Sequence, residues 1–410
     1  MVLCEEKKDC CACGACVNIC PKQAISLKSD ENGFLFPKID TQKCIECGLC
    51  KNVCDFKKPI GEQEYKAKCY FAVRNDKEQL LESTSGGMFS TLAEHILEQG
   101  GIVYGSTLEK KGRDFSVIHV GIVKKEELGR LRGSKYVQSN TGMIYKNVKD
   151  DLENGKKVLF CGTPCQVAGL KSYLGKERDN LYTTDLICHG TPSVEMFNSY
   201  IHYLEKKNKW KISKVHFRRK QEKIDSTMYF LDVCLENGKE KRIFCKLLSY
   251  YGYFLSSDIC RESCYHCKYA CEKRVGDITL GDAWGVEDVN PEILVENGGI
   301  IDKTRGLSSV MVNSYKGNVL LDSIKERVTL SETTFENISK QNHQLIHPTS
   351  MSDKRENILR NYREYGYEAV DKLYFNEMGM KQYFKWKYYL PLTNLISKDI
   401  KKKIKYLFKR

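Results

Sequence analysis

Short apolar runs alternate with helical patterns through the middle of the chain. Runs such as 69–74 (CYFAVR) and 157–161 (KVLFC) predict strands, because they are rich in β-branched, aromatic and other apolar residues. Segment 86–99 carries apolar residues at helical spacing and ends at Gly100–Gly101, which predicts an amphipathic helix. The same reasoning predicts strands at 102–108, 115–123, 181–188, 215–218, 228–236 and 240–244, and helices at 140–154, 164–174 and 193–207. This alternation predicts an α/β body whose helices cover a mixed sheet.

Two cysteine ladders with the spacing C-x2-C-x2-C-x3-C lie near the N-terminus. They consist of Cys10, Cys13, Cys16 and Cys20, and of Cys44, Cys47, Cys50 and Cys54. The spacing is typical of bacterial ferredoxins with two cubane [4Fe–4S] clusters, in which the fourth cysteine of each ladder binds the other cluster. We therefore assign one cluster to Cys10, Cys13, Cys16 and Cys54, and the other to Cys44, Cys47, Cys50 and Cys20. Zinc is the alternative, but zinc sites usually contain two C-x2-C pairs.

The segment between the ladders, AISLKSDENGFLFPKID, predicts two short strands around a turn at Asp30–Gly33. We therefore expect an α+β ferredoxin-type domain in front of the α/β body. Cys4 and Cys11 fit neither ladder and are expected to be non-ligands. Because all four corners of each cubane would be occupied, the domain is expected to carry electrons between a ferredoxin-like donor and a redox centre in the body.

Four motifs in the body have candidate chemistry. Ser83–Gly87 (STSGG) stands at a helix start and could hold an anion or simply cap the helix. Gly133–Tyr136 is a turn with one cation and one aromatic residue, typical also of a surface loop. Phe160–Gln166 is a strand-to-helix turn, where α/β proteins place cofactor phosphates. Asp185–Ser193 contains a Cys-His pair, which predicts either a nucleophile with its base or a metal ligand beside a packed histidine.

A third group of cysteines follows later in the chain. Cys260, Cys264, Cys267 and Cys271 have x3, x2 and x3 spacing, which predicts one more iron–sulfur cluster, with a zinc knuckle as the alternative. The strand expected next, DITLGDAW, ends near Asp282 and Trp284, where both could face a planar cofactor. Neither G-x-G-x-x-G nor a Walker A motif is present, so a nicotinamide-binding Rossmann domain is not supported.

Composition narrows the class of protein. With 41% hydrophobic and 29% charged residues, the 410-residue chain is not disordered as a whole. It has no apolar run of membrane-spanning length, and its first residues have no apolar signal-peptide core, so a cytoplasmic protein with reduced thiols is expected. The net charge of +13 is concentrated: residues 381–410 hold ten Lys/Arg and one Asp, which leaves +4 for the rest. This distribution argues against nucleic-acid binding.

The basic C-terminal end predicts a helix of its own. Aromatic residues and lysines interleave from 383 onwards, and Ile400, Ile404 and Leu407 recur at helical spacing. Such a basic amphipathic helix favours an acidic partner or a peripheral position at the inner face of a membrane. A solvated terminal helix is the alternative.

These motifs, in this order, resemble a known family. The ferredoxin ladders, STSGG, GSKYVQS, GTPCQVAGL, ICHGTPS, CRESCYHCKYA and GDITLGDAWG are similar to those of the coenzyme F420 hydrogenase/dehydrogenase beta-subunit family, over residues 1–330. The resemblance implies FAD and one [4Fe–4S] cluster in the body. It also implies four regions: a ferredoxin domain at 1–62, a region like the N-terminal part of those beta subunits at 63–150, a region like their C-terminal part with the third cluster at 151–335, and a basic helical extension at 336–410.

The resemblance also implies site residues. Cys260, Cys264 and Cys267 are the implied ligands of the body cluster, with Cys165, Cys188 or Cys271 as the fourth. The implied flavin-site residues are Ser85, Gly86, Gly87, Lys135, Tyr136, Thr163, Pro164, Gln166 and Trp284. No catalytic residue is identified; the candidates are Cys188, His189 and Asp282. Ala283 stands where the family usually has an aromatic residue, which leaves the shape of the substrate pocket open.

Together these features predict an iron–sulfur flavoprotein oxidoreductase. Electrons from a ferredoxin-like donor would reach FAD and then an organic small molecule, F420-type or other. A flavin fits this place because it exchanges electrons singly with clusters and in pairs with organic substrates. The alternatives are a non-catalytic electron-transfer subunit of a larger complex, a metal-stabilised interaction protein, and a reductase of a sugar-linked intermediate in surface-polysaccharide synthesis.

Overall fold

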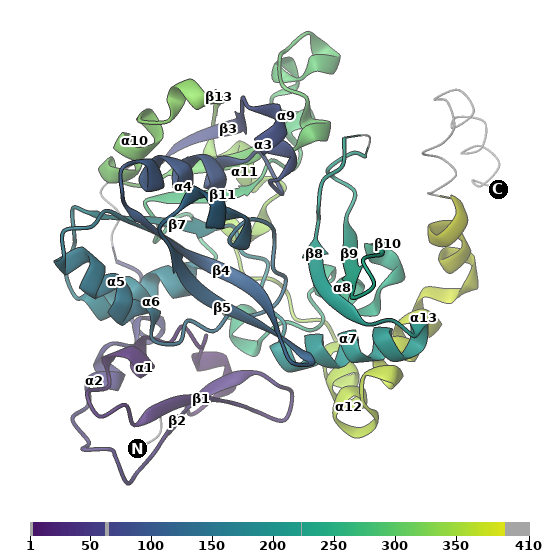
Figure 1. The fold of residues 1–410 in the computed structure, drawn as a ribbon, viewed down its shortest axis with the longest axis horizontal. Helices are drawn as coiled ribbons and strands as arrows, with labels where there is room; N and C mark the ends of the chain where they lie inside the picture. Colours follow the sequence, from purple (N-terminus) through teal and green to yellow (C-terminus); the bar gives the residue numbers. More distant parts are fainter. Residues whose placement is uncertain (1–2, 62–64, 223, 390–410) are drawn as a thin grey trace.

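The computed structural model describes residues 3–61, 65–222 and 224–389 (Figure 1). Of the basic C-terminal end, this range includes only the last turns of helix α13 and a π-helical turn at Lys385–Tyr389. The amphipathic helix expected around Ile400, Ile404 and Leu407 lies outside the described residues. Among the helices described, none has both the length and the apolar character needed to cross a membrane.

The N-terminal part forms a small domain of its own (Figure 1). Strands β1 (Ile25–Ser29) and β2 (Leu35–Ile39) pair antiparallel around the expected turn. Each cysteine ladder leads into a short helix, α1 (Ala15–Ile19) or α2 (Leu49–Asn52). The glycines before these helices, Gly14 and Gly48, have φ angles of 85° and 75°. Other residues adopt such angles at a cost, so glycine allows the ladder to turn sharply into its helix.

An eight-stranded mixed sheet forms the body, in the order β13-β3-β12-β11-β7-β6-β4-β5. Strands β4, β6, β7 and β11 run parallel, and the pairs at both edges are antiparallel. The strand bounds are β3 (Lys68–Arg74), β4 (Ile102–Lys111), β5 (Asp114–Ile122), β6 (Val158–Cys161), β7 (Leu181–Leu186), β11 (Ile278–Asp282), β12 (Ser308–Val312) and β13 (Val328–Thr333). Strands from the two regions expected at 63–150 and 151–335 therefore belong to one sheet.

Helices cover both faces of this sheet. Helices α4 (Met88–Glu98) and α10 (Tyr315–Asp322) pack on one face, where Val103 and Leu159 lie in the same core. Helices α5 (Ile144–Glu153) and α6 (Pro164–Leu174) pack on the other face, and the N-terminal domain adds Ala15 and Val53 to that core. The remaining short helices of the body are α3 (Lys77–Leu81), α9 (Val286–Val289) and α11 (Phe335–Ser339).

Another hydrophobic core, rich in aromatic residues, lies beside the main sheet. Strands β8 (Ile212–Phe217), β9 (Phe230–Leu235) and β10 (Glu240–Phe244) form a three-stranded antiparallel sheet, in which β9 and β10 pair as a hairpin. They pack with α7 (Val194–Asn208), α8 (Ser249–Leu255), α12 (Arg355–Tyr365) and α13 (Tyr367–Phe384). Tyrosines such as Tyr200, Tyr250 and Tyr251 are fully buried there.

The predicted elements of the body are present, with shifted ends that have local causes. Helix α4 begins at Met88 instead of 86, since Gly87 has a φ of 82°. Helix α5 begins at Ile144 instead of 140, because Asn140 bridges to β5 at Ile118. Strand β11 ends at Asp282, so Trp284 lies beyond it.

Candidate functional site

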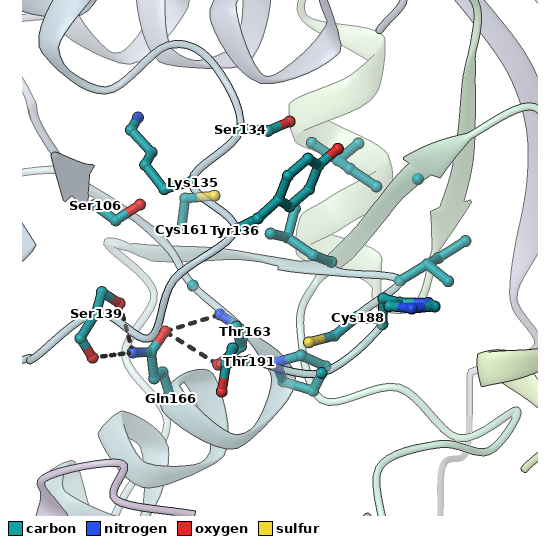
Figure 2. Close-up of a pocket in the computed structure, with 18 of the residues that line it drawn as sticks. Ser106, Ser134, Lys135, Tyr136, Ser139, Cys161, Thr163, Gln166, Cys188 and Thr191 are labelled. Carbon is teal, nitrogen blue, oxygen red and sulfur yellow. Dashed lines mark hydrogen bonds between the residues drawn. The ribbon is translucent and has the colours of Figure 1, made fainter. Parts of the chain in front are cut away.

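A cavity of about 350 Å³ opens at the carboxyl ends of the parallel strands (Figure 2). Segments that follow β6, β7 and β11 line it, together with the loop before α4 and residues 131–139. In α/β proteins this edge of the sheet is the usual place for a cofactor. The four motifs of the sequence thus meet at one cavity although they are distant along the chain.

Most of the expected flavin-site residues line this cavity. They are Ser85, Gly87, Lys135, Tyr136, Thr163, Pro164 and Gln166. Gly86 lies behind the cavity wall: a Cβ there would be 2.2 Å from the Ala72 carbonyl oxygen, so glycine lets the loop pack on β3. Trp284 does not line the cavity either; its ring contacts the ring of Tyr229, with centroids 5.9 Å apart.

A capping box holds the turn between β6 and α6. The Thr163 N–H donates to Oε1 of Gln166 over 3.0 Å, and Nε2 of Gln166 donates to the backbone oxygen and hydroxyl of Ser139 (Figure 2). Pro164 occupies the first helical position, which needs no N–H donor. This arrangement points the N-terminus of an 11-residue helix at the cavity, where its positive end favours an anionic group.

A half-buried lysine and a buried arginine add positive charge to the cavity wall. Nζ of Lys135 donates to the backbone oxygens of Leu131 and Arg132, and burial lowers the pKa of Lys135 to about 7. Arg218 pairs with Asp282 across 2.6 Å, and its guanidinium lies 4.1 Å from the ring centroid of Tyr229. Arg218 has a φ of 55°, an angle uncommon outside glycine. No sequence motif marks Arg218, so it was not among the predicted site residues.

The three catalytic candidates, Cys188, His189 and Asp282, all line the cavity. His189 is tied to the end of α8, since its Nε2 lies 3.1 Å from the Phe254 carbonyl oxygen and 2.9 Å from the hydroxyl of Ser257. Burial lowers the pKa of His189, so this ring is neutral near pH 7. These contacts fit the packed-histidine interpretation better than a proton-transfer pair with Cys188.

The second cysteine ladder surrounds a small hollow. Its walls include Cys44, Cys47 and Cys50, and Cys20 from the first ladder. Gly48 lies in the same wall, where an added Cβ would meet open space. This is the crossed set that the ferredoxin spacing predicts, so the residues present fit a cubane cluster.

The remaining ladder cysteines gather in the complementary set. Burial and then the nearby thiols of Cys13, Cys10, Cys54 and Cys50 raise the pKa of Cys16, so the other three members of this set, and Cys50 of the second ladder, lie within electrostatic reach of Cys16. Within the described residues, no group of three or more His, Cys, Asp or Glu side chains converges closely enough to hold a single metal ion.

The body cysteines form a third set around the loop after β7. A Cβ on Gly190 would lie 2.8 Å from Sγ of Cys260, which places the Cys188 loop directly on that cysteine. Cys188, Cys264, Cys267 and Cys165 all line the cavity. After burial, the thiols of Cys264, Cys165 and Cys267 raise the pKa of Cys188, and those of Cys165 and Cys264 raise the pKa of Cys267. Cys271 lies apart: its thiol donates to the Lys273 carbonyl oxygen over 3.3 Å, and no thiol is among the causes of its pKa shift.

The first ladder packs against the cavity from the other side. A Cβ on Gly169 of α6 would lie 2.9 Å from Sγ of Cys13, and the hydroxyl of Tyr145 donates to the Cys13 carbonyl oxygen over 2.7 Å. Cys11, expected to be a bystander, lies between the thiols of Cys13 and Cys165 and contacts both. Arg261 crosses the same junction, and its Nε donates to the Cys10 carbonyl oxygen over 2.7 Å.

These cysteine sets define an iron–sulfur redox protein, and comparison with known proteins identifies its relatives. Residues 9–58 match a 4Fe-4S dicluster domain, and residues 155–337 match the family described as the C terminus of the coenzyme F420 hydrogenase/dehydrogenase beta subunit. The chain therefore joins a segment that matches a dicluster domain to a mixed-sheet α/β body, and residues 155–337 of that body match the beta-subunit family, as the motifs of the sequence predicted. It is an oxidoreductase-type electron-transfer protein related to those beta subunits.

The chain was also compared with solved structures and with curated proteins. The chain resembles a chain of the F420-reducing [NiFe] hydrogenase complex from Methanosarcina barkeri at 17% identity, over 76% of this chain and 92% of that one, with a TM-score of 0.41. The search of curated proteins found no match.

Proposed function

We propose that this protein is an iron–sulfur flavoprotein oxidoreductase that passes electrons from a ferredoxin-like donor to FAD and then to an organic small molecule. One observation carries the proposal: Cys188, Cys264 and Cys267 line the same cavity as the expected flavin-site residues, and the first cysteine ladder packs on helix α6, whose N-terminus lines that cavity. Clusters supply one-electron steps, and FAD, when bound, converts these into the paired transfer that most organic reductions need.

The cysteines divide into three ligand sets. The proposed sets are Cys10, Cys13, Cys16 and Cys54; Cys44, Cys47, Cys50 and Cys20; and Cys260, Cys264, Cys267 and Cys188. Cys188 is preferred as the fourth body ligand because Gly190, two residues on, lies against Cys260. Cys165 then stands beside this set, in contact with Cys11, and Cys271 is left outside it.

The exposure of the ladders suggests the direction of approach. Cys47 is exposed, and its neighbours Ile45 and Leu49 are 57% and 42% exposed. The first ladder, in contrast, is packed against α6 through Cys13. The second ladder therefore faces an external donor, and the first faces the body.

For FAD, the cavity supplies complementary groups. The N-terminus of α6 and Lys135 offer positive charge to a pyrophosphate, and Tyr136 offers an aromatic surface at the cavity wall. Arg218, held by Asp282, closes the side nearest the three-stranded sheet. An F420-type molecule is one candidate substrate, and a sugar-linked molecule is the other.

The test is the reduction of the flavin by reduced ferredoxin under anaerobic conditions, measured by the absorbance of the flavin. Cys47→Ser should abolish this reduction while dithionite still reduces the flavin directly. Cys234→Ser is the matched control, because Cys234 lies on β9 outside all three sets and its thiol contacts Glu240. Unchanged ferredoxin-driven reduction in Cys47→Ser, or a protein without flavin, would refute the proposal. F420 and sugar-linked acceptors are then added to reduced protein, and flavin reoxidation identifies the substrate class.

A further inference from the structure

Arg261 is a buried cation at the junction between the N-terminal domain and the body. Its side chain is 1% exposed, and it donates to the Cys10 carbonyl oxygen over 2.7 Å and to Oε1 of Gln138 over 3.3 Å. Its guanidinium lies 4.1 Å from the ring centroid of Phe36. Within the described part of the chain, no carboxylate forms an ion pair with Arg261, and its Nη2 is buried without a hydrogen-bond partner.

A buried charge of this kind needs a compensating charge. Arginine stays protonated under all ordinary conditions, and an isolated cation away from water is unfavourable unless an anion lies nearby. The contacts of Arg261 with two oxygens and one aromatic ring are all neutral. We therefore expect the compensating negative charge to come from the iron–sulfur clusters that the two flanking cysteine sets would bind.

Arg261 lies between those sets. Its side chain donates to the Cys10 carbonyl oxygen in the first ladder, and in sequence it lies between Cys260 and Cys264 of the body set. Arg261 directly precedes the 3-10 turn Glu262–Cys264. Its backbone N–H donates to the Thr191 carbonyl oxygen in the loop after Cys188. A cluster held by four cysteinates is anionic and gains one negative charge when it is reduced.

We propose that Arg261 is the shared counter-charge of the first-ladder cluster and the body cluster, and that it raises the reduction potentials of both. The inference rests on the proposed function, since it requires both clusters. An electron passed from the first-ladder cluster to the body cluster would oxidise the first and reduce the second. The charge of Arg261 is constant, so no proton need accompany the transfer, and the same cation favours the reduced form on either side. Arg261 is a positioning residue and does not react.

Arg355 offers a matched control. It is also buried, at 8% exposure, and its guanidinium donates to the Cys260 carbonyl oxygen at 3.2–3.3 Å and lies 5.3 Å from the ring centroid of Tyr265. Among the described residues, the hydrogen bonds of its guanidinium go to the body set and not to the first ladder. Removing its charge should therefore affect one cluster, whereas removing the charge of Arg261 should affect two.

The experiment is an EPR-monitored redox titration of the anaerobically purified full chain, with iron analysis of each variant. Arg261→Gln should lower two cluster potentials, each by at least a tenfold change in the reduction equilibrium, which is 59 mV for one electron. Arg355→Gln should lower one potential. Arg261→Lys should change both potentials alike or leave both unchanged, because whatever charge the buried lysine carries acts on both clusters.

Two results would overturn the inference. The first is unchanged potentials in an Arg261→Gln protein that keeps its iron. The second, which applies even if Arg261→Gln loses its clusters, is an Arg261→Lys protein in which one of the two potentials falls tenfold or more and the other does not change. A wild-type protein without clusters or flavin would instead refute the proposed function, so the two failures are distinguishable.

Discussion

Gly169→Ala tests whether the dicluster domain is docked on α6. The added Cβ would lie 2.9 Å from Sγ and 3.1 Å from Cβ of Cys13, and 3.2 Å from the hydroxyl of Tyr145. Comfortable contacts between such atoms lie near 3.5–4.0 Å. One methyl group therefore has to move the first ladder, or the helix beneath it, by roughly 0.5–1 Å.

The size of the effect follows from two opposing contributions. Overpacking of a well-packed contact costs about 1–3 kcal/mol. Alanine stabilises the interior of α6 itself by about 1 kcal/mol relative to glycine. We expect the docking of the dicluster domain to weaken by up to about 2 kcal/mol, which is close to a 30-fold shift in the docking equilibrium.

Amide hydrogen exchange in residues 10–20 measures this equilibrium. Gly169→Ala should exchange up to about 30-fold faster there, and ferredoxin-driven flavin reduction should slow, while the iron content is retained. Gly129→Ala is the control, because a Cβ at Gly129 meets no atom within 4 Å. Equal exchange rates in residues 10–20 of the two variants would refute the docking geometry.

The other predictions concern the body cluster and the cavity. Gly190→Ala should reduce iron from about twelve to about eight atoms per chain, since Gly190 has a φ of 113° and its Cβ would lie 2.8 Å from Sγ of Cys260. Cys188→Ser should cause the same loss in iron analysis and Cys271→Ser should not; the reverse pattern would contradict the ligand set. FAD affinity, measured by fluorescence titration, should fall as pH rises through about 7, where Lys135 loses its charge. Lys135→Met should bind FAD more weakly and without this pH dependence; a retained dependence would exclude Lys135 as its source.

The sequence predicts local features of this molecule well. Cysteine spacing alone predicts the crossed ladder sets, because the spacing reflects how a short loop wraps one cluster. Hydrophobic periodicity predicts β3 to β10 and their helices, because each of these elements has its own apolar pattern and turn residues.

Features that depend on contacts distant in sequence were not predictable. Strands β12 and β13 pair with β3 more than 230 residues earlier, and no local pattern specifies this neighbour. Arg218 and Arg261 lie in charged stretches that resemble solvated surface, and only the fold buries them. Cys11 seemed a bystander because it is outside the ladder, yet the packing of α6 brings Cys165 to it. Trp284 lies next to the cavity in sequence but packs on Tyr229.

The most direct test of the central claim is the cofactor content of anaerobically purified protein. Three cubane clusters and one flavin require about twelve iron atoms and one FAD per chain, with visible absorbance that dithionite bleaches reversibly. A colourless protein that contains only zinc and shows no absorbance change with dithionite would contradict the account.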